Sequence, residues 1–276
     1  MTIAVIGARG DMAKNFLVPF LGKIGKVIKI DKHSNKAIWC RAWSSDVIWL
    51  SVPREEVPAI LHNLKLKPSQ LIVDICSMKK NISDLVLNSG ATHLSLHPLQ
   101  GPFVPLKFQK WVVIKTRQGP TAKKIISLLK DQGVSLINVK SESEHDFMMG
   151  AVLAMPEFLT VIIHLLLKNF ATHNKRKNLR LKELLDWATP AFNVLIHFYL
   201  HSINSTPGWL RKEFVLQKKM HFWVTAKKTL NAISAMNFVD ISRVLNSQKL
   251  NLSRQLTSSE QISIRRSVNK WYTEMN

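Results

Sequence analysis

Two kinds of hydrophobic pattern divide the chain. Up to about residue 140, short apolar runs alternate with stretches in which apolar residues recur every three or four positions. This alternation is typical of βαβ units, in which helices cover a parallel sheet. Strands are predicted over 2–6, 26–30, 46–52, 71–75, 94–97, 111–115 and 135–139. Helices are predicted after the first strand to residue 21, over 54–63, up to about 88, and over 120–131.

From residue 141 on, the pattern is helical. Ser141 and Glu144 have the spacing of a capping box, which starts a helix predicted to run to about Phe170. That helix is apolar on nearly all sides, so it has to be covered by its own domain or by a second subunit. Further helical stretches are predicted over 181–203, 209–236 and 257–275.

These patterns predict an α/β fold with two domains. Residues 1–140 form an N-terminal Rossmann-like domain with a doubly wound sheet that binds a dinucleotide. Residues 141–276 form a C-terminal all-helical domain for substrate binding and dimerisation. We expect a homodimer through the helical domain.

Charge raises one other class of function. The 276 residues carry a formal net charge of +21, which would suit nucleic acid or an anionic membrane. However, the lysines are spread along the chain, and the densest run, 168–182, lacks the interleaved aromatic residues of a base-stacking surface. We therefore expect a basic solvated surface rather than nucleic-acid binding, and a field that favours anionic substrates.

Three further features narrow the class of protein. The chain has only two cysteines, so neither a disulfide framework nor a metal site is predicted, which suits the cytoplasm. The first predicted strand begins at Thr2, which leaves no room for a secretion signal. The most apolar segment, 150–167, is short and contains Pro156 and Glu157, so it is interpreted as a buried helix, not a membrane span.

A glycine turn joins the first predicted strand to the helix that follows. Gly7 permits a tight turn, Gly10 lets backbone amides approach a pyrophosphate, and Ala13 is small enough for the helix to pack on the strand. A phosphate would then lie at a helix N-terminus, where unpaired N–H groups favour an anion. The residues predicted to contact the dinucleotide in this turn are Gly7, Ala8, Arg9, Gly10, Asp11 and Met12.

Asp31 ends the second predicted strand, about twenty residues beyond the glycine turn. A carboxylate there hydrogen-bonds the adenosine ribose hydroxyls, which favours NAD over NADP. Lys32 and His33 follow at once and leave NADP open.

Three other predicted strands end close to polar residues, Ser51, Ser77 and His97. If these residues point to the same edge of the sheet, they face the nicotinamide half of a cofactor. Ser51 and the nearby Pro53 are predicted cofactor contacts, although a serine after a strand also serves as a helix N-cap. His97 is the candidate catalytic residue, because a neutral imidazole is suited to proton transfer near pH 7, and Ser77 is its candidate partner.

The motifs taken in order resemble those of the prephenate dehydrogenase family, which includes arogenate dehydrogenases. D-x-x-S-x-K, H-P-x-x-G-P and E-H-D in this order are specific, and the match covers essentially the whole chain. The matching segments are 5–13, 51–53, 74–79, 96–102 and 144–146.

The resemblance implies NAD-dependent oxidative decarboxylation of prephenate, a small anionic cyclohexadienyl compound, to 4-hydroxyphenylpyruvate in tyrosine biosynthesis. By position, His97 would accept the proton of the substrate hydroxyl while hydride goes to the nicotinamide. Ser77 would orient that hydroxyl or His97, and Gln100 and Gly101 would contribute to the substrate pocket.

Two predicted substrate contacts depart from the family pattern. Glu157 stands where a Pro-His or Arg-His pair is usual, and His201 stands at or near a carboxylate-binding arginine. A histidine offers at most one charge-assisted bond where arginine offers two. Glu157 could instead pair with an amino group, which favours arogenate or another amino-bearing analogue. A further alternative is a dinucleotide-binding regulatory module that has lost catalysis.

Overall fold

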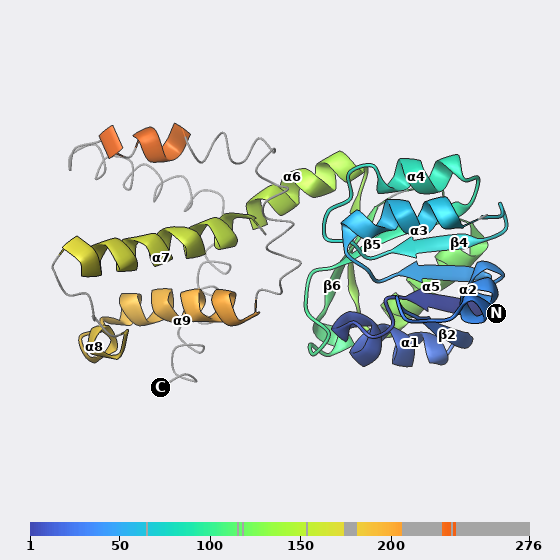
Figure 1. Cartoon of the computed structure of the whole chain (residues 1–276), viewed down its shortest axis with the longest axis horizontal. Coiled ribbons are helices and arrows are strands. Elements are labelled where there is room, and N and C mark those ends of the chain that lie inside the picture. Colours follow the sequence, from blue (N-terminus) through green and yellow to red (C-terminus); the bar gives the residue numbers. More distant parts are fainter. Residues whose placement is uncertain are drawn as a thin grey trace. The chain divides into compact units, whose positions relative to one another are not determined.

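The computed structural model describes residues 1–64, 66–114, 116–117, 119–152, 154–173, 181–205, 228–232 and 234–235. The chain divides into two compact units, Met1–Val152 and Leu153–Asn276. The first unit contains a sheet flanked by helices, and the described residues of the second are largely helical (Figure 1).

A seven-stranded sheet in the order β2-β1-β3-β4-β5-β6-β7 organises the first unit. Its strands lie where the hydrophobic runs predict them, so this part of the sequence interpretation is confirmed. Their bounds are β1 Thr2–Ile6, β2 Lys26–Ile30, β3 Val47–Leu50, β4 Leu71–Asp74, β5 Thr92–Pro98, β6 Lys110–Ile114 and β7 Ser135–Val139.

Strand β6 reverses the direction of the sheet, which the sequence pattern did not predict. It pairs antiparallel with β5, with Pro98 opposite Trp111, whereas the other pairs of the described sheet are parallel. The connection between them holds only a short 3₁₀ turn, η3 (Leu106–Phe108). A parallel pair needs a longer crossover, usually with a helix, so this short connection requires the reversal.

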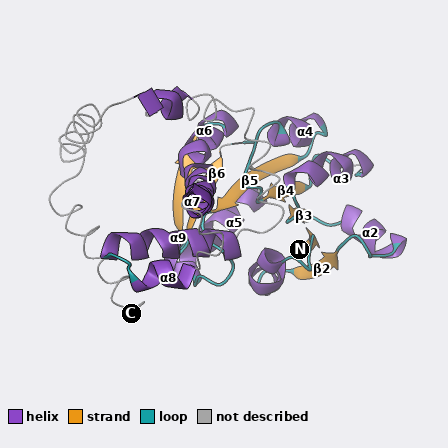
Figure 2. Ribbon diagram, turned by 60° about the vertical axis from the view of Figure 1, so that its left-hand side comes forward, coloured by secondary structure: helices purple, strands orange, loops and turns teal. Residues whose placement is uncertain are grey.

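Helices cover both faces of the sheet (Figure 2). One face packs on η1, α1 and α5, and the other on α2, α3 and α4, because successive strand residues such as Val5 and Ile6 point to opposite faces. This arrangement confirms the predicted doubly wound domain. The bounds are η1 Ala13–Leu17, α1 Val18–Gly22, α2 Lys36–Trp43, η2 Arg54–Glu56, α3 Val57–Asn63, α4 Ile82–Asn88 and α5 Pro120–Asp131.

Helix α2 was not predicted. Its N-cap is Asn35, whose side-chain oxygen accepts a hydrogen bond from the Ile38 N–H at 3.0 Å. Ala42 is buried, and Ile38, Trp39 and Trp43 pack against the same core cluster. The helix has only eight residues, so its periodicity extends over few turns.

The helical second half begins with α6 (Glu142–Val152) and α7 (Ala154–His173). The predicted N-cap is present, because the Glu144 N–H donates to Ser141 Oγ at 3.1 Å. The Glu144 carboxylate, however, accepts from the Lys140 N–H at 2.8 Å. The stretch predicted as one helix over 144–170 is described as two, with residue 153 outside the described part. Helix α6 belongs to the first unit, beyond the predicted boundary near Lys140.

The stretch predicted as one helix over 181–203 is two, α8 (Leu181–Asp186) and α9 (Pro190–Ser205). Thr189 caps the start of α9, since its Oγ1 accepts a hydrogen bond from the Phe192 N–H at 3.3 Å. Pro190 suits the first position of the helix, because it has no N–H that would need an acceptor there. Within 209–236, residues 228–232 and 234–235 are helical, and the helix predicted over 257–275 lies outside the described residues. None of the described helices is both long and apolar enough to cross a membrane.

The turn after β1 depends on Gly7. Its φ is +85°, which side-chain-bearing residues rarely adopt, and its N–H donates to the Ile30 carbonyl at 2.9 Å. A Cβ there would lie 2.2 Å from the Ser51 carbonyl oxygen. Gly7 therefore allows the turn to approach the end of β3 closely.

We predict that Gly7→Ala destabilises the protein by at least about 2 kcal/mol, because the new methyl group clashes with backbone and the φ is unfavourable. Gly22→Ala is the matched control, since a Cβ at Gly22 meets nothing within 4 Å. Urea unfolding measures both, and equal stability of the two variants would contradict the account.

Candidate functional site

One end of the site is a pocket beside the glycine turn. It measures about 420 Å³ and lies between the turn after β1 and the loop after β2. Its lining residues are Ala8, Arg9, Lys29, Asp31, His33, Ser34, Asn35 and Ile38. The pocket thus brings together three residues that the sequence predicts for dinucleotide binding, Ala8, Arg9 and Asp31.

Asp31 is held in place from both sides of the pocket. One carboxylate oxygen, Oδ2, lies 2.8 Å from Arg9 Nε, and the other, Oδ1, accepts the His33 N–H at 2.8 Å. The Asp31 N–H donates to Ser34 Oγ at 3.0 Å. The Arg9 side chain is 76% exposed, so its guanidinium is free to meet an anion while it neutralises Asp31.

The carboxyl ends of β3, β4 and β5 form the other end of the site. Ser51 follows β3, and its N–H donates to the Ile6 carbonyl at 2.9 Å, next to the glycine turn. Ser77 follows β4, and His97 is the second-last residue of β5. Since β1, β3, β4 and β5 are parallel neighbours, these residues lie at one edge, as predicted.

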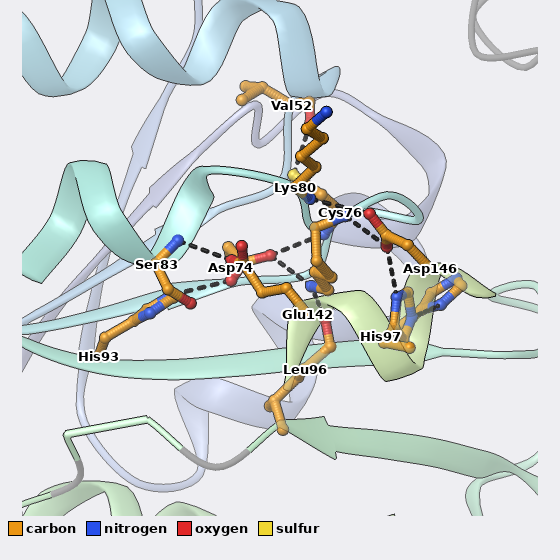
Figure 3. A network of polar contacts seen from close by, with 12 residues as sticks. Val52, Asp74, Cys76, Lys80, Ser83, His93, Leu96, His97, Glu142 and Asp146 are labelled. Atoms are coloured by element: carbon orange, nitrogen blue, oxygen red, sulfur yellow. Dashed lines mark hydrogen bonds and ion pairs between the residues drawn. The ribbon is translucent and has the colours of Figure 1, made fainter. Parts of the chain in front are cut away.

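A charged cluster is buried beneath this edge. Lys79 Nζ contacts Asp74 Oδ1, and His93 Nε2 lies 2.9 Å from Asp74 Oδ2 (Figure 3). Burial alone would raise the pKa of Asp74. The Lys79 cation and the His93 hydrogen bond outweigh that effect and hold the pKa of Asp74 far below its ordinary value. Asp74 is therefore an anion, although its side chain and its two partners are fully buried.

His97 is joined to helix α6 by a chain of hydrogen bonds. Its Nδ1 lies 2.9 Å from His145 Nε2, and His145 Nδ1 lies 2.8 Å from Asp146 Oδ1 (Figure 3). Asp146 also accepts the backbone N–H groups of Lys79 at 2.9 Å and Lys80 at 3.0 Å. We call His97, His145 and Asp146 the relay.

The relay fixes where the protons lie. As an ionised acceptor, Asp146 requires the hydrogen of His145 to be on Nδ1, which leaves His145 Nε2 as an acceptor. His97 must then donate from Nδ1, so its Nε2 carries the lone pair. Burial, reinforced by the Lys79 cation, holds the pKa of His97 well below its usual value. His97 is therefore a neutral base at pH 7.

Glu142 anchors the helix that carries half of the relay. Its two carboxylate oxygens accept the Asn81 N–H at 3.0 Å and the Ser83 N–H at 2.7 Å, which caps the start of α4. Together with the Asp146 contacts, this ties α6 to the loop after β4.

The other predicted site residues are placed as follows. Ser77 is half-buried, and its hydroxyl makes no hydrogen bond to any residue that the structure describes. Gln100 Oε1 accepts the Lys110 N–H at 2.6 Å and so holds the loop after β5, in which Gly101 is exposed. Pro53 precedes η2.

Four further predicted residues lie on helical segments. Asp11 and Met12 lie at the start of the helical segment after the glycine turn. Glu157 and His201 lie on α7 and α9 of the second unit, and their side chains are outside the described part. No cluster of His, Cys, Asp or Glu suited to a metal ion occurs among the described residues.

Sequence reasoning missed the members of the buried network as site residues. His145 and Asp146 belong to the E-H-D motif, and Asp74 and Lys79 are the ends of D-x-x-S-x-K. Those motifs were the available signal. Their meaning depends on contacts between segments that are distant in sequence, such as Lys79 with Asp146.

Comparison with known proteins supports the fold. No protein-family model and no curated protein sequence matches the chain. Among solved structures, arogenate dehydrogenase from Synechocystis aligns with 93% of this chain and 100% of its own, at 14% identity and a TM-score of 0.61.

Prephenate dehydrogenase from Aquifex aeolicus aligns with 92% of this chain and 98% of its own, at 17% identity and a TM-score of 0.59. The same enzyme in complex with hydroxyphenyl propionate and NAD⁺ aligns with 100% of this chain and 98% of its own, at 18% identity and a TM-score of 0.57. The chain therefore shares the fold of these dehydrogenases, as the motifs predicted.

The buried cluster makes a prediction about acid unfolding. The pKa of Asp74 is lower in the folded protein than the unfolded value of about 3.9, so its contribution to stability is full above that pH and is lost as the pH falls below it. Asp74→Asn should therefore flatten the dependence of the unfolding free energy on pH between about pH 4.5 and 2.5. Urea unfolding measures this. Asp84→Asn, at an exposed position of α4, should keep the wild-type slope, and a wild-type slope in Asp74→Asn would refute the assignment.

Proposed function

We propose that this protein is an NAD-dependent dehydrogenase of the prephenate and arogenate dehydrogenase family that acts in tyrosine biosynthesis in the cytoplasm. The observation that carries the proposal is the neutral His97, with its Nε2 lone pair unused, at the carboxyl edge of a dinucleotide-binding sheet. The shared fold and the ordered motif series support it.

The residues of the glycine turn fit NAD. Gly7 makes the tight turn after β1, the helical segment begins at Asp11, and Asp31 lies in the adjacent pocket where the ribose hydroxyls would bind. Bound NAD would accept a hydride from the substrate. Arg9 beside Asp31 would also suit a 2′-phosphate, so NADP is the alternative cofactor.

His97 would perform the proton transfer. Its Nε2 accepts the proton of the substrate hydroxyl as hydride leaves the same carbon. The imidazolium that forms donates from Nδ1 to His145, and Asp146 stabilises the charge at the far end of the relay. His97 returns the proton when the ring carboxylate leaves as carbon dioxide and the ring becomes aromatic. Ser77 would orient the hydroxyl.

Prephenate is the proposed substrate, and arogenate or another amino-bearing analogue is the alternative. Glu157 favours the alternative, because a carboxylate would repel a dicarboxylate and pair with an amino group. Arg211 or Arg180 could supply the cation that His201 does not, whereas Lys79 is buried against Asp74. We also propose a homodimer through the helical domain, supported by exposed apolar side chains on α7 such as Leu165 and Leu166.

We predict that His97→Asn lowers kcat by about 10³-fold, because the general base is lost, while the Kd for NAD stays unchanged. In the wild type, kcat/KM should stay constant as the pH falls from 8 to below 6.5, because the lowered pKa of His97 keeps the base neutral.

His62→Asn, on the exposed face of α3, is the control and should behave as wild type. NADH formation and NAD titration provide both readouts. A wild type that binds NAD but forms no NADH would favour a regulatory dinucleotide-binding module. Turnover that survives in His97→Asn would refute His97 as the base, and an activity loss centred near pH 6.5 would contradict the neutral base.

A second prediction concerns the substrate. His201→Arg should lower the KM for prephenate by about tenfold, because arginine adds a second charge-assisted bond to a carboxylate. An unchanged or raised KM would show that His201 does not contact the substrate. NADH formation with arogenate is measured in parallel. Arogenate turnover that Glu157→Gln abolishes would favour the amino-bearing substrate. Efficient turnover of prephenate with none of arogenate would overturn the role given to Glu157.

A further inference from the structure

Lys79 is a buried cation that the proposed reaction does not use. Its side chain has no exposed surface, and it lies in the loop between β4 and α4. An ammonium group without solvent is costly to bury, so its partners indicate what it does. Those partners are Asp74, the Leu96 carbonyl and, through the Lys79 backbone, Asp146.

The side chain and the backbone of Lys79 contact two different groups that position His97. Lys79 Nζ donates to the Leu96 carbonyl oxygen at 2.6 Å, and Leu96 immediately precedes His97 on β5. The Lys79 backbone N–H donates to Asp146 Oδ1 at 2.9 Å, the same oxygen that His145 Nδ1 contacts. Lys79 therefore fixes both the strand that carries the base and the carboxylate that ends the relay.

We propose that Lys79 is a positioning residue of the site. Through its hydrogen bonds to the Leu96 carbonyl and to Asp146, it holds His97 in the geometry required for proton transfer. The kinetic part of this proposal rests on the proposed function. Asp74 serves Lys79 as its buried counter-ion, so that the cation can be kept next to the base.

Electrostatics add to the positioning. The charged and titratable groups that the structure places around His97 are Lys79 and Asp74 from the β4 side, and His145 and Asp146 from α6. The Lys79 cation disfavours a second positive charge on His97, whereas the Asp74 anion favours it. Removing Lys79 alone would leave a buried anion near His97, so the informative variant removes the ion pair as a unit.

The test compares Lys79→Met/Asp74→Asn with Asp74→Asn alone. In the single variant, Lys79 loses its counter-ion but can still donate to the Leu96 carbonyl, so kcat should fall by less than in the double variant. In the double variant that bond is gone, and kcat should fall by about 30-fold or more with little change in the KM for NAD. Lys124→Met, at an exposed position of α5, is the control for loss of a lysine.

Three results would overturn the proposal. They are a folded double variant with wild-type kcat, an equal loss of kcat in the single and double variants, and a loss that appears only in the KM for NAD. If the double variant does not fold, Lys79→Gln in the Asp74→Asn background replaces it. In wild type, ¹⁵N NMR of labelled lysines should show one ammonium group protected from exchange, and its absence would also refute the proposal.

The failure of this proposal differs from the failure of the proposed function. If the wild type oxidises neither prephenate nor arogenate, the dehydrogenase assignment fails. The ¹⁵N signals of the His97 ring then test Lys79 without turnover. They should shift between Asp74→Asn and the double variant if Lys79 positions His97, and unchanged signals would refute that role.

Discussion

The hydrogen bond between His97 Nδ1 and His145 Nε2 is the contact on which the candidate site depends. Because both rings are buried and the Asp146 carboxylate accepts from the far side, only one arrangement of ring hydrogens satisfies the chain of donors and acceptors. That arrangement leaves the lone pair on His97 Nε2. The chemistry of the site follows from a hydrogen-bond pattern that begins on another helix.

This pattern requires α6 to be held firmly against the sheet. Glu142 and Asp146 together accept hydrogen bonds from four backbone N–H groups of the Lys79–Ser83 segment. These amides lie before or at the start of α4 and would otherwise lack an acceptor. The same segment holds Lys79 over the buried Asp74. The loop after β4 thus links the charged cluster of Asp74, Lys79 and His93 to the relay.

Local patterns predicted most of the sheet because its strands are apolar on both faces and bounded by turns, as at β1 and Gly7. They also predicted which strand ends carry Ser51, Ser77 and His97. They did not predict α2, which is only eight residues long, or the reversal of β6, which follows from how short the preceding connection is.

The buried network lay beyond local reasoning for a different reason. Lys79 resembles a surface lysine in sequence, and its burial follows only from Asp74, the Leu96 carbonyl and Asp146 converging on it. Likewise, the protonation of His97 is set by His145, which is distant in sequence. Motif order indicated that these segments matter, and the contacts supply the physical reason.

The most direct test of this account is ¹⁵N NMR of the histidine rings in the free protein, with His97 assigned by its loss in His97→Asn. We expect a neutral His97 ring protonated at Nδ1 and unprotonated at Nε2, unchanged from about pH 8 to below pH 6.5. A ring protonated at Nε2, or an imidazolium at pH 7, would contradict the assignment of His97 as the base.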